Sequence, residues 1–273
     1  MQELHNHSNI RSIEHENQHI NIFEAHRYST LVHFYAYKEG LIDLDDPPML
    51  VLFDGHDDCE APKLPNVLKN IDIKTVSERE FSTFVNFDMN WNDSDWIFTS
   101  MELGLISDLV IIGGDSTGRG YGHSIYTSMK GTTHNIWKIN QLWNALDSRG
   151  DLVDHIKSHM EPLWEALGWT GRDFDPDQGK PIIVDIDLDF MTINTAEVLT
   201  SIPYEIFKHI WTKPLHRGVT CKHFFEDLLE RTELICIAME SDYTGSIVNS
   251  WENLLVIDAV MFSNSLPLRR NFT

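Results

Sequence analysis

The sequence contains few cysteines, few basic residues and no long apolar run. Its three cysteines, Cys59, Cys221 and Cys236, are widely spaced and form no C-x-x-C pair, which excludes a disulfide framework or a zinc knuckle as the basis of the fold. No apolar run is long enough to cross a membrane, and the polar N-terminus lacks the apolar core of a signal peptide. We therefore expect a soluble protein of the reducing cytoplasm.

Basic residues are also scarce relative to acidic ones. The chain has 21 lysines and arginines against 42 aspartates and glutamates, which gives a formal net charge of −21. This balance argues against binding to nucleic acid or to an anionic membrane, and it favours attraction of a cationic partner. A surface that is acidic only for solubility explains the same numbers, so the charge alone does not identify a partner.

Length and patterning predict one α/β domain over residues 1–273, with residues 1–20 as a flexible or loosely packed arm. Continuous apolar segments that end at Gly or Asp predict buried parallel strands at 49–54, 108–115, 181–190 and 233–240. Helical patterns lie between them at 135–150, 151–168 and 222–232, and 168–181 has the composition of a loop. This alternation is typical of a sheet covered by helices on both faces.

Acidic residues mark the ends of these predicted strands. Ligands of open parallel sheets bind beyond the carboxyl ends of the strands, where the connecting loops meet. We therefore expect four acids from distant parts of the chain to gather at one edge of the sheet, namely Asp54, Asp187, Asp189 and Glu240.

Two triplets place ionisable residues at alternate positions: Asp54, His56 and Asp58, and then Asp185, Asp187 and Asp189. In an extended chain, alternate residues project to one side, so each triplet is expected to face one place. Several carboxylates at one place need a counter-cation, and oxygen ligands with one or two imidazoles suit Mn²⁺, Mg²⁺ or Fe²⁺. More than four ligand groups indicate two metals. Either triplet alone is also compatible with a solvated loop of an acidic protein.

Three segments in the same order carry a resemblance to a known family. They read "FEAHRYS", "FDGHDD" and "VDIDLDFM". "FDGHDD" resembles the D-x-H-x-D motif of the arginase and agmatinase (ureohydrolase) superfamily, and "DIDLDF" is similar to its S-x-D-x-D motif. The set of three is more similar still to uncharacterised-protein family 0489, which includes peptide arginases. The resemblance covers residues 22–245 and implies a three-layer α/β/α arginase-like fold with a mostly parallel sheet.

The resemblance also implies a site for two Mn²⁺ ions, with ligands His26, Asp54, His56, Asp58, Asp187 and Asp189. Asp54 matches a carboxylate that bridges the two ions. Asp185 takes the serine position of the family motif, which places it behind the ligands, although a register that uses Asp185 and Asp187 as the ligands stays open. Glu24 lies two residues before His26 and is expected to orient its imidazole, unless it only begins a helix.

The implied activity is hydrolysis of a guanidinium group to urea and ornithine. Asp189 is the candidate for moving a proton beside the attacking water, and Glu240 is the candidate for binding the guanidinium. An exposed loop or capping acid is an equally good interpretation of Glu240. His123 and His134 are weaker candidates for a proton relay at the edge of the site, and Trp91 and Trp96 for contacts with a peptide.

The chain departs from arginases in two respects. The G-G-D-H-S motif is missing before "FDGHDD", and "GGDST" at 113–117 follows it without the histidine. The regions that hold the amino and carboxylate groups of free arginine have no counterpart. We therefore expect the substrate to be an arginine-containing precursor peptide, and the protein to be a peptide-maturation enzyme.

Two other functions are compatible with the same residues. Deacetylases are similar in fold, hold one zinc ion and hydrolyse an amide, so the number of metals per chain discriminates between the two reactions. The metal could instead stabilise a module that binds a cationic peptide without catalysis. Oligomeric state, the peptide and the physiological metal are not predicted.

Overall fold

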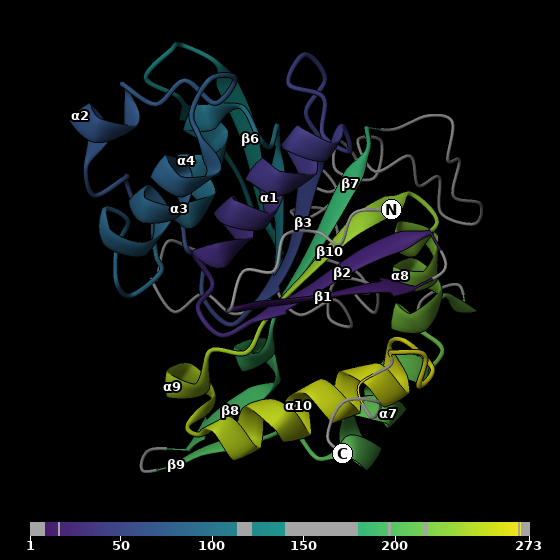
Figure 1. The fold of residues 1–273 in the computed structure, drawn as a ribbon. Coiled ribbons are helices and arrows are strands. Elements are labelled where there is room, and N and C mark those ends of the chain that lie inside the picture. Colours follow the sequence, from purple (N-terminus) through teal and green to yellow (C-terminus); the bar gives the residue numbers. More distant parts are fainter. Residues whose placement is uncertain are drawn as a thin grey trace.

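A sheet of eight strands forms the centre of the protein (Figure 1). The computed structural model describes residues 9–15, 17–113, 122–139, 180–195, 198–215, 218–266 and 268. The strands of this sheet are β1 Ile10–His15, β2 Gln18–Phe23, β3 Met49–Asp54, β4 Leu109–Gly113, β5 Gly122–Thr127, β6 Thr133–Ile139, β7 Ile182–Asp187 and β10 Thr232–Ala238. Across the sheet they follow the order β1-β2-β10-β7-β3-β4-β6-β5.

The six inner strands are parallel, and the edge strands β1 and β5 pair antiparallel with β2 and β6. The predicted α/β class with a mostly parallel sheet is therefore confirmed. The prediction for 49–54 coincides with β3, and the predictions for 108–115 and 233–240 correspond to β4 and β10 within one or two described residues. Continuous burial on both faces explains why these strands were recognisable as apolar runs.

Three predictions of secondary structure are wrong in part. Residues 10–15 and 18–20, expected in a flexible arm, form β1 and the start of β2, because Ile13 and Ile20 alternate with polar residues and pack into the core. The predicted helix at 135–150 begins with strand residues of β6, which pairs with β4, and 140–150 lie outside the described residues. The strand predicted to reach 190 ends at Asp187 and continues as the 3₁₀ turn η1 (Leu188–Met191).

Helices cover both faces of the sheet and complete three layers (Figure 1). One face carries α1 Tyr28–Glu39, α2 Pro65–Leu68, α3 Glu78–Phe87 and α4 Trp96–Leu103. The other carries α7 Tyr204–Thr212, α8 Cys221–Leu229 and α10 Ile247–Val260, so the predicted helix at 222–232 corresponds to α8. The predicted helix at 151–168 and the loop at 168–179 lie outside the described residues.

Smaller elements lie beside the carboxyl ends of the parallel strands. The hairpin of β8 (Thr192–Thr195) and β9 (Val198–Ser201) follows η1, and the short α9 (Ser241–Thr244) follows β10 (Figure 1). Contacts of α9 with η1, β9 and α10 join these pieces. Among the helices that the structure describes, none is long and apolar enough to cross a membrane.

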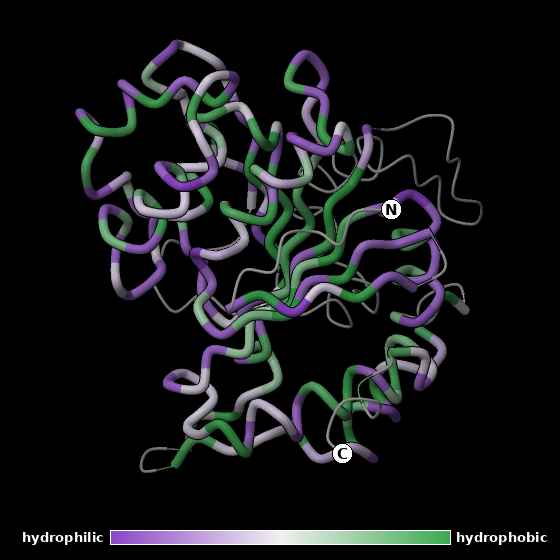
Figure 2. The backbone as a smooth tube through the Cα atoms, in the orientation of Figure 1, coloured by the Kyte–Doolittle hydropathy of each residue, from purple (hydrophilic) through white to green (hydrophobic). Residues whose placement is uncertain are grey.

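The central strands are apolar along most of their length, as their green colour in Figure 2 shows. β3 and β7 have every residue buried, yet β3 ends in Asp54 and β7 carries Asp185 and Asp187. Burial of a neutral polar group without a partner costs on the order of 2 to 7 kcal/mol, and burial of an unpaired ionised carboxylate costs far more. The surroundings of these acids must therefore offset a large penalty.

Candidate metal centre

Four neighbouring strands deliver the candidate residues to one edge of the sheet. β2, β10, β7 and β3 lie side by side, and all four are parallel. His26 follows the carboxyl end of β2, Glu240 follows β10, and Asp187 and Asp54 end β7 and β3. The fold therefore brings these residues together as expected, although His26 and Glu240 are 214 residues apart in the sequence.

The first group of ligand atoms surrounds Nδ1 of His26. This atom lies 3.1 Å from Oδ2 of Asp58, 3.2 Å from Oδ2 of Asp187 and 3.8 Å from Oδ2 of Asp54. The imidazole, Asp54 and Asp187 are buried, and Asp58 is nearly so. One imidazole nitrogen and three carboxylate oxygens thus face a common point.

The second group surrounds Nδ1 of His56. It lies 2.5 Å from Oδ2 of Asp189 and 3.8 Å from Oδ1 of Asp54. The His56 side chain is 36% exposed, whereas the carboxylates are buried, so this group faces solvent on the side of the imidazole. Asp54 takes part in both groups, which is the arrangement expected of a bridging carboxylate.

Backbone N–H groups hold one oxygen of each strand-end carboxylate. Asp54 Oδ1 accepts from His56 N (2.6 Å), Asp187 Oδ1 from Asp189 N (2.9 Å) and Asp189 Oδ1 from Gly55 N (2.8 Å). The second oxygen, Oδ2, faces His26 in Asp54 and Asp187 and faces His56 in Asp189. The carboxylates are thereby oriented before any cation binds, which is what a tight metal site requires.

Two glycines are needed for this close packing. A Cβ on Gly55 would lie 2.9 Å from Oδ1 of Asp189, and one on Gly113 would lie 1.8 Å from the backbone oxygen of Asp54. "GGDST" thus contributes through Gly113, while its residues 114–117 lie outside the described residues. The glycine of "FDGHDD" is explained by the hydrogen bond that its N–H donates to Asp189.

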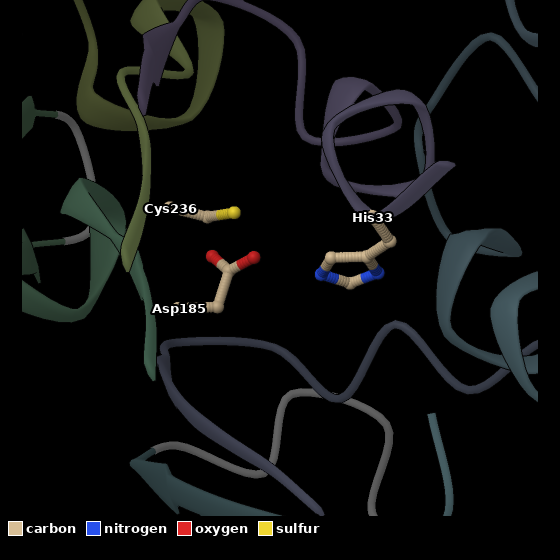
Figure 3. A group of neighbouring side chains, drawn as sticks. All are labelled: His33, Asp185 and Cys236. Carbon is tan, nitrogen blue, oxygen red and sulfur yellow. The ribbon is translucent and has the colours of Figure 1, made fainter. Parts of the chain in front are cut away.

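Asp185 lies behind His26, away from the metal-facing nitrogen. Its Oδ1 is 3.0 Å from Nε2 of His26, and its Oδ2 accepts a 2.6 Å hydrogen bond from Ser29 Oγ. Figure 3 shows its carboxylate between the Cys236 sulfur and the His33 imidazole, all three being buried. Since both oxygens already have partners, this arrangement supports the register in which Asp187 and Asp189 face the site and Asp185 orients His26.

The pKa shifts of the site residues show how much charge is confined at this edge of the sheet. Burial raises the pKa of Asp54 well above its usual range, and the neighbouring Asp58 and Asp189 add to the rise. Burial likewise raises the pKa of Asp187 to about 7. Burial alone would lower the pKa of His26, but Asp185 and the other carboxylates outweigh it and raise the pKa well above 6.5. Without a cation, protons must neutralise these groups.

The donor set fits a pair of divalent cations. Nδ1 of His26 and Oδ2 of Asp54 are buried atoms without a hydrogen-bond partner among the described residues. Such atoms are rare in proteins unless they bind something. Carboxylate oxygens with one imidazole per group are ligands that suit Mn²⁺, Mg²⁺ or Fe²⁺.

Glu240 and Glu24 occupy different places. Glu240 is buried, and its Oε1 accepts a 3.1 Å hydrogen bond from the backbone N–H of His26, so it belongs to the site and is not an exposed loop acid. Burial raises its pKa well above the usual range, and Asp187 adds to the rise. Glu24 is exposed and accepts from Ser241 N at 2.8 Å. The contact with the His26 imidazole that we expected of Glu24 is made by Asp185.

Sequence reasoning missed Asp93. This residue lies in the loop between α3 and α4, is 6% exposed, and accepts a 3.0 Å hydrogen bond from His26 N. Its carboxylate also pairs with Arg27. The segment "NWNDSDW" is polar throughout, so no pattern distinguished this acid from its neighbours.

The two candidate tryptophans and the two remaining candidate histidines lie in different places relative to the site. Trp96 is buried and donates from Nε1 to Asp58 Oδ2 at 2.8 Å, whereas Trp91 is 82% exposed. His134 contacts the backbone oxygen of Ser107, which precedes β4, and therefore lies at the amino end of the strands, opposite the site. His123 is on the edge strand β5, 3.0 Å from Asn135 Oδ1.

No family model matches the chain, and no curated protein matches it. The function therefore has to be inferred from the geometry described above, together with the motif resemblance.

Proposed function

We propose that this protein is a binuclear metal hydrolase of the arginase-like type, which converts arginine side chains of a peptide to ornithine and releases urea. The proposal includes membership of the ureohydrolase superfamily, close to family 0489, and an arginase-like fold. One observation supports it most: two groups of ligand atoms, around His26 and His56, share the carboxylate of Asp54.

Six residues hold the cations in this proposal, each group using one imidazole nitrogen and several carboxylate oxygens: His26, Asp54, His56, Asp58, Asp187 and Asp189. When bound, a pair of divalent cations supplies a water that is acidic enough to act as a nucleophile near neutral pH. Mn²⁺ is the metal we propose, on the chemistry of the ligands.

The protein groups then have separate tasks. Glu240, buried beside the first group, binds the positively charged guanidinium through a charge-assisted pair. Asp189 Oδ2, beside His56, accepts the proton of the attacking water and returns it to the departing amine. The C–N bond to the side-chain nitrogen breaks and a C–O bond forms, so a guanidinium and one water give a protonated amine and neutral urea.

A peptide fits the surroundings better than free arginine. Among the residues that the structure describes, Arg27 and Lys138 form ion pairs beside the site, with Asp93 and Asp57. Each of these positive charges is already balanced by an acid, so neither offers an unopposed charge to the α-carboxylate of a free amino acid. The net charge of −21 also favours a cationic peptide.

Urea release tests the proposal. The purified chain is stripped of metal, reloaded with Mn²⁺ and incubated with arginine-containing peptides, while urea is assayed and peptide masses are measured. We expect urea and peptides that have lost the mass of a cyanamide unit per arginine. Asp187→Asn serves as the inactive control, and a lysine peptide as the substrate control.

The same preparation separates the alternatives. Two metals per chain with urea release support the proposal, and one metal per chain with amide hydrolysis would support a deacetylase-like enzyme instead. Peptide binding without turnover, unchanged by Asp187→Asn, would support a metal-stabilised binding module.

A further inference from the structure

Two buried acids converge on one backbone N–H group beside the site. His26 N donates to Oδ2 of Asp93 at 3.0 Å and to Oε1 of Glu240 at 3.1 Å. The two carboxyl groups are close enough to hydrogen-bond to each other. They come from distant parts of the chain, Asp93 from the loop before α4 and Glu240 from the segment after β10.

Both acids have an uncommon backbone conformation. The φ angle is +61° at Asp93 and +40° at Glu240, in the left-handed region that most residues avoid. Non-glycine residues in this region are strained and are enriched at functional sites. Their position is therefore maintained at a cost, which indicates that the pairing of these acids has a purpose beyond filling space.

One resident guanidinium faces this pair. Arg27 Nη1 contacts Oδ1 of Asp93, and among the described residues its one other hydrogen bond is a long one, 3.5 Å, to the backbone oxygen of Trp91. Its Nε is buried and has no partner among the described residues. The guanidinium of Arg27 thus has donors without a partner among the described residues, and it contacts Asp93, the acid that itself lies within hydrogen-bond reach of Glu240.

The guanidinium of Arg27 is chemically the same group as the proposed substrate. If it moved from Asp93 to Glu240, it would occupy the acid that is proposed to bind the substrate. Burial makes such a pair strong, because a carboxylate in this environment lacks competing water. In the structure, the carboxylate that Arg27 contacts is that of Asp93.

We propose that Asp93 is a positioning residue that holds the Arg27 guanidinium away from Glu240, so that Glu240 is free for the guanidinium of the substrate. Loss of Asp93 turns Arg27 into an internal competitor for the substrate. This inference rests on the proposed function, in which Glu240 binds guanidinium.

A double-mutant cycle tests it by calorimetric binding of an arginine-containing peptide to the Mn²⁺-loaded protein. We expect Asp93→Asn to weaken binding about tenfold or more, because a buried charge pair now excludes the peptide. Arg27→Gln is expected to bind within about twofold of wild type, and the double variant Arg27→Gln/Asp93→Asn to recover that affinity. We also expect the Asp93→Asn variant to have a raised KM for the peptide, while its kcat at saturating peptide changes little.

A purely structural ion pair predicts a different pattern. Arg27→Gln and Asp93→Asn would then do equal harm, and the double variant would not recover binding, which would overturn the proposal. Arg79→Gln, on the exposed surface of α3, controls for loss of a positive charge, and Asp46→Asn controls for loss of an exposed negative charge. Asn retains an oxygen that can accept from His26 N, and thermal melting verifies that the variant is folded.

A crystal structure of the Asp93→Asn variant gives a readout that needs no substrate. We expect the Arg27 guanidinium to lie on Glu240 in that variant. A guanidinium that stays in its original place contradicts the inference even if urea release has confirmed the proposed function. If the wild-type protein makes no urea, the proposed function is wrong. The position of the Arg27 guanidinium in the Asp93→Asn variant then still decides whether Asp93 restrains it.

Discussion

The two ligand groups of the candidate centre differ in how they are held. His26 is buried, its ring lies 4.5 Å from the Trp96 ring, and its backbone N–H and both ring nitrogens face acids. His56 is 36% exposed, and its ring packs edge-on against Tyr243, with centroids 5.2 Å apart. The first group is enclosed by protein, and the second is open on one side.

In the proposed centre, this difference would separate two tasks. A cation held by the His26 group would be surrounded by oriented ligands and would exchange slowly, since leaving would require several buried groups to open. A cation held by the His56 group would lie next to solvent and next to an arriving substrate. We therefore expect the His26 group to anchor the centre and the His56 group to exchange metal and meet the peptide.

Removal of the shared ligand is expected to have the largest effect. Asp54→Asn takes one carboxylate from both groups and leaves the remaining acids at the same place without their bridging partner. We expect turnover to fall below detection and the metal content to fall below one per chain. Elemental analysis after gel filtration, with Asp46→Asn as a matched surface control, measures this. Two retained metals would show that Asp54 does not bridge.

The two histidines are expected to give unequal losses. His26→Asn removes a buried imidazole that faces several carboxylates, and we expect a loss of about 3–5 kcal/mol in the free energy of unfolding. His56→Asn alters a partly exposed ring, and we expect about 1 kcal/mol or less, with one metal retained. Denaturant unfolding and elemental analysis of both variants test the comparison. Equal losses of unfolding free energy and of metal in the two variants would contradict the distinction between the His26 group and the His56 group.

Asp185→Asn is expected to weaken metal binding without abolishing it. Asn can accept from Nε2 of His26, but it removes the charge that polarises this imidazole. Loss of such an orienting partner costs about 10–100-fold in metal affinity. Competition with a fluorescent chelator measures the affinity, and the weaker site in the variant is predicted to be the one beside His26. An unchanged metal affinity would mean that Asp185 contributes only to the packing of the core and does not orient His26 for metal binding.

The smallest expected effect is the pH dependence of the stability of the protein. Burial raises the pKa of Asp187 to about 7, and the hydrogen bond with Asp189 raises that of His56 to about 9. Both groups bind protons more tightly in the folded state, so their contribution is complete at low pH and is lost as pH rises through these values. Metal-free protein should therefore lose thermal stability between about pH 5 and about pH 9.

Mn²⁺ should reverse this trend, because cation binding needs deprotonated ligands and strengthens as pH rises. Melting curves in chelator and in excess Mn²⁺, at matched pH, show the difference. Metal-free protein whose melting temperature stays constant or rises over this range would contradict the assignment of protons to these groups.

Part of this centre follows from sequence alone. "MLVLFD" and "PIIVDIDLDF" are buried strands that end in acids, and parallel strands bring their carboxyl ends together, so the meeting of Asp54 with Asp187 was predictable. The alternation within the triplets was a poorer guide. Asp58 has φ of +38° and Asp189 lies in a 3₁₀ turn, so turns bring these two acids to the site, and strand geometry does not.

Other features depend on tertiary contacts that no local pattern encodes. Asp93 reaches His26 from a polar loop, and Asp185 takes the place that Glu24 was expected to have. β6 was mistaken for a helix because its apolar spacing suits both structures, and pairing with β4 decides between them. Short apolar segments are ambiguous until their neighbours are known.

The most direct test of the central claim is anomalous diffraction from crystals grown with Mn²⁺, recorded on both sides of the manganese absorption edge. Our account predicts two manganese peaks, one bound by Nδ1 of His26 and the other by Nδ1 of His56, with Asp54 touching both. A single peak, or peaks away from these two imidazoles, would contradict it.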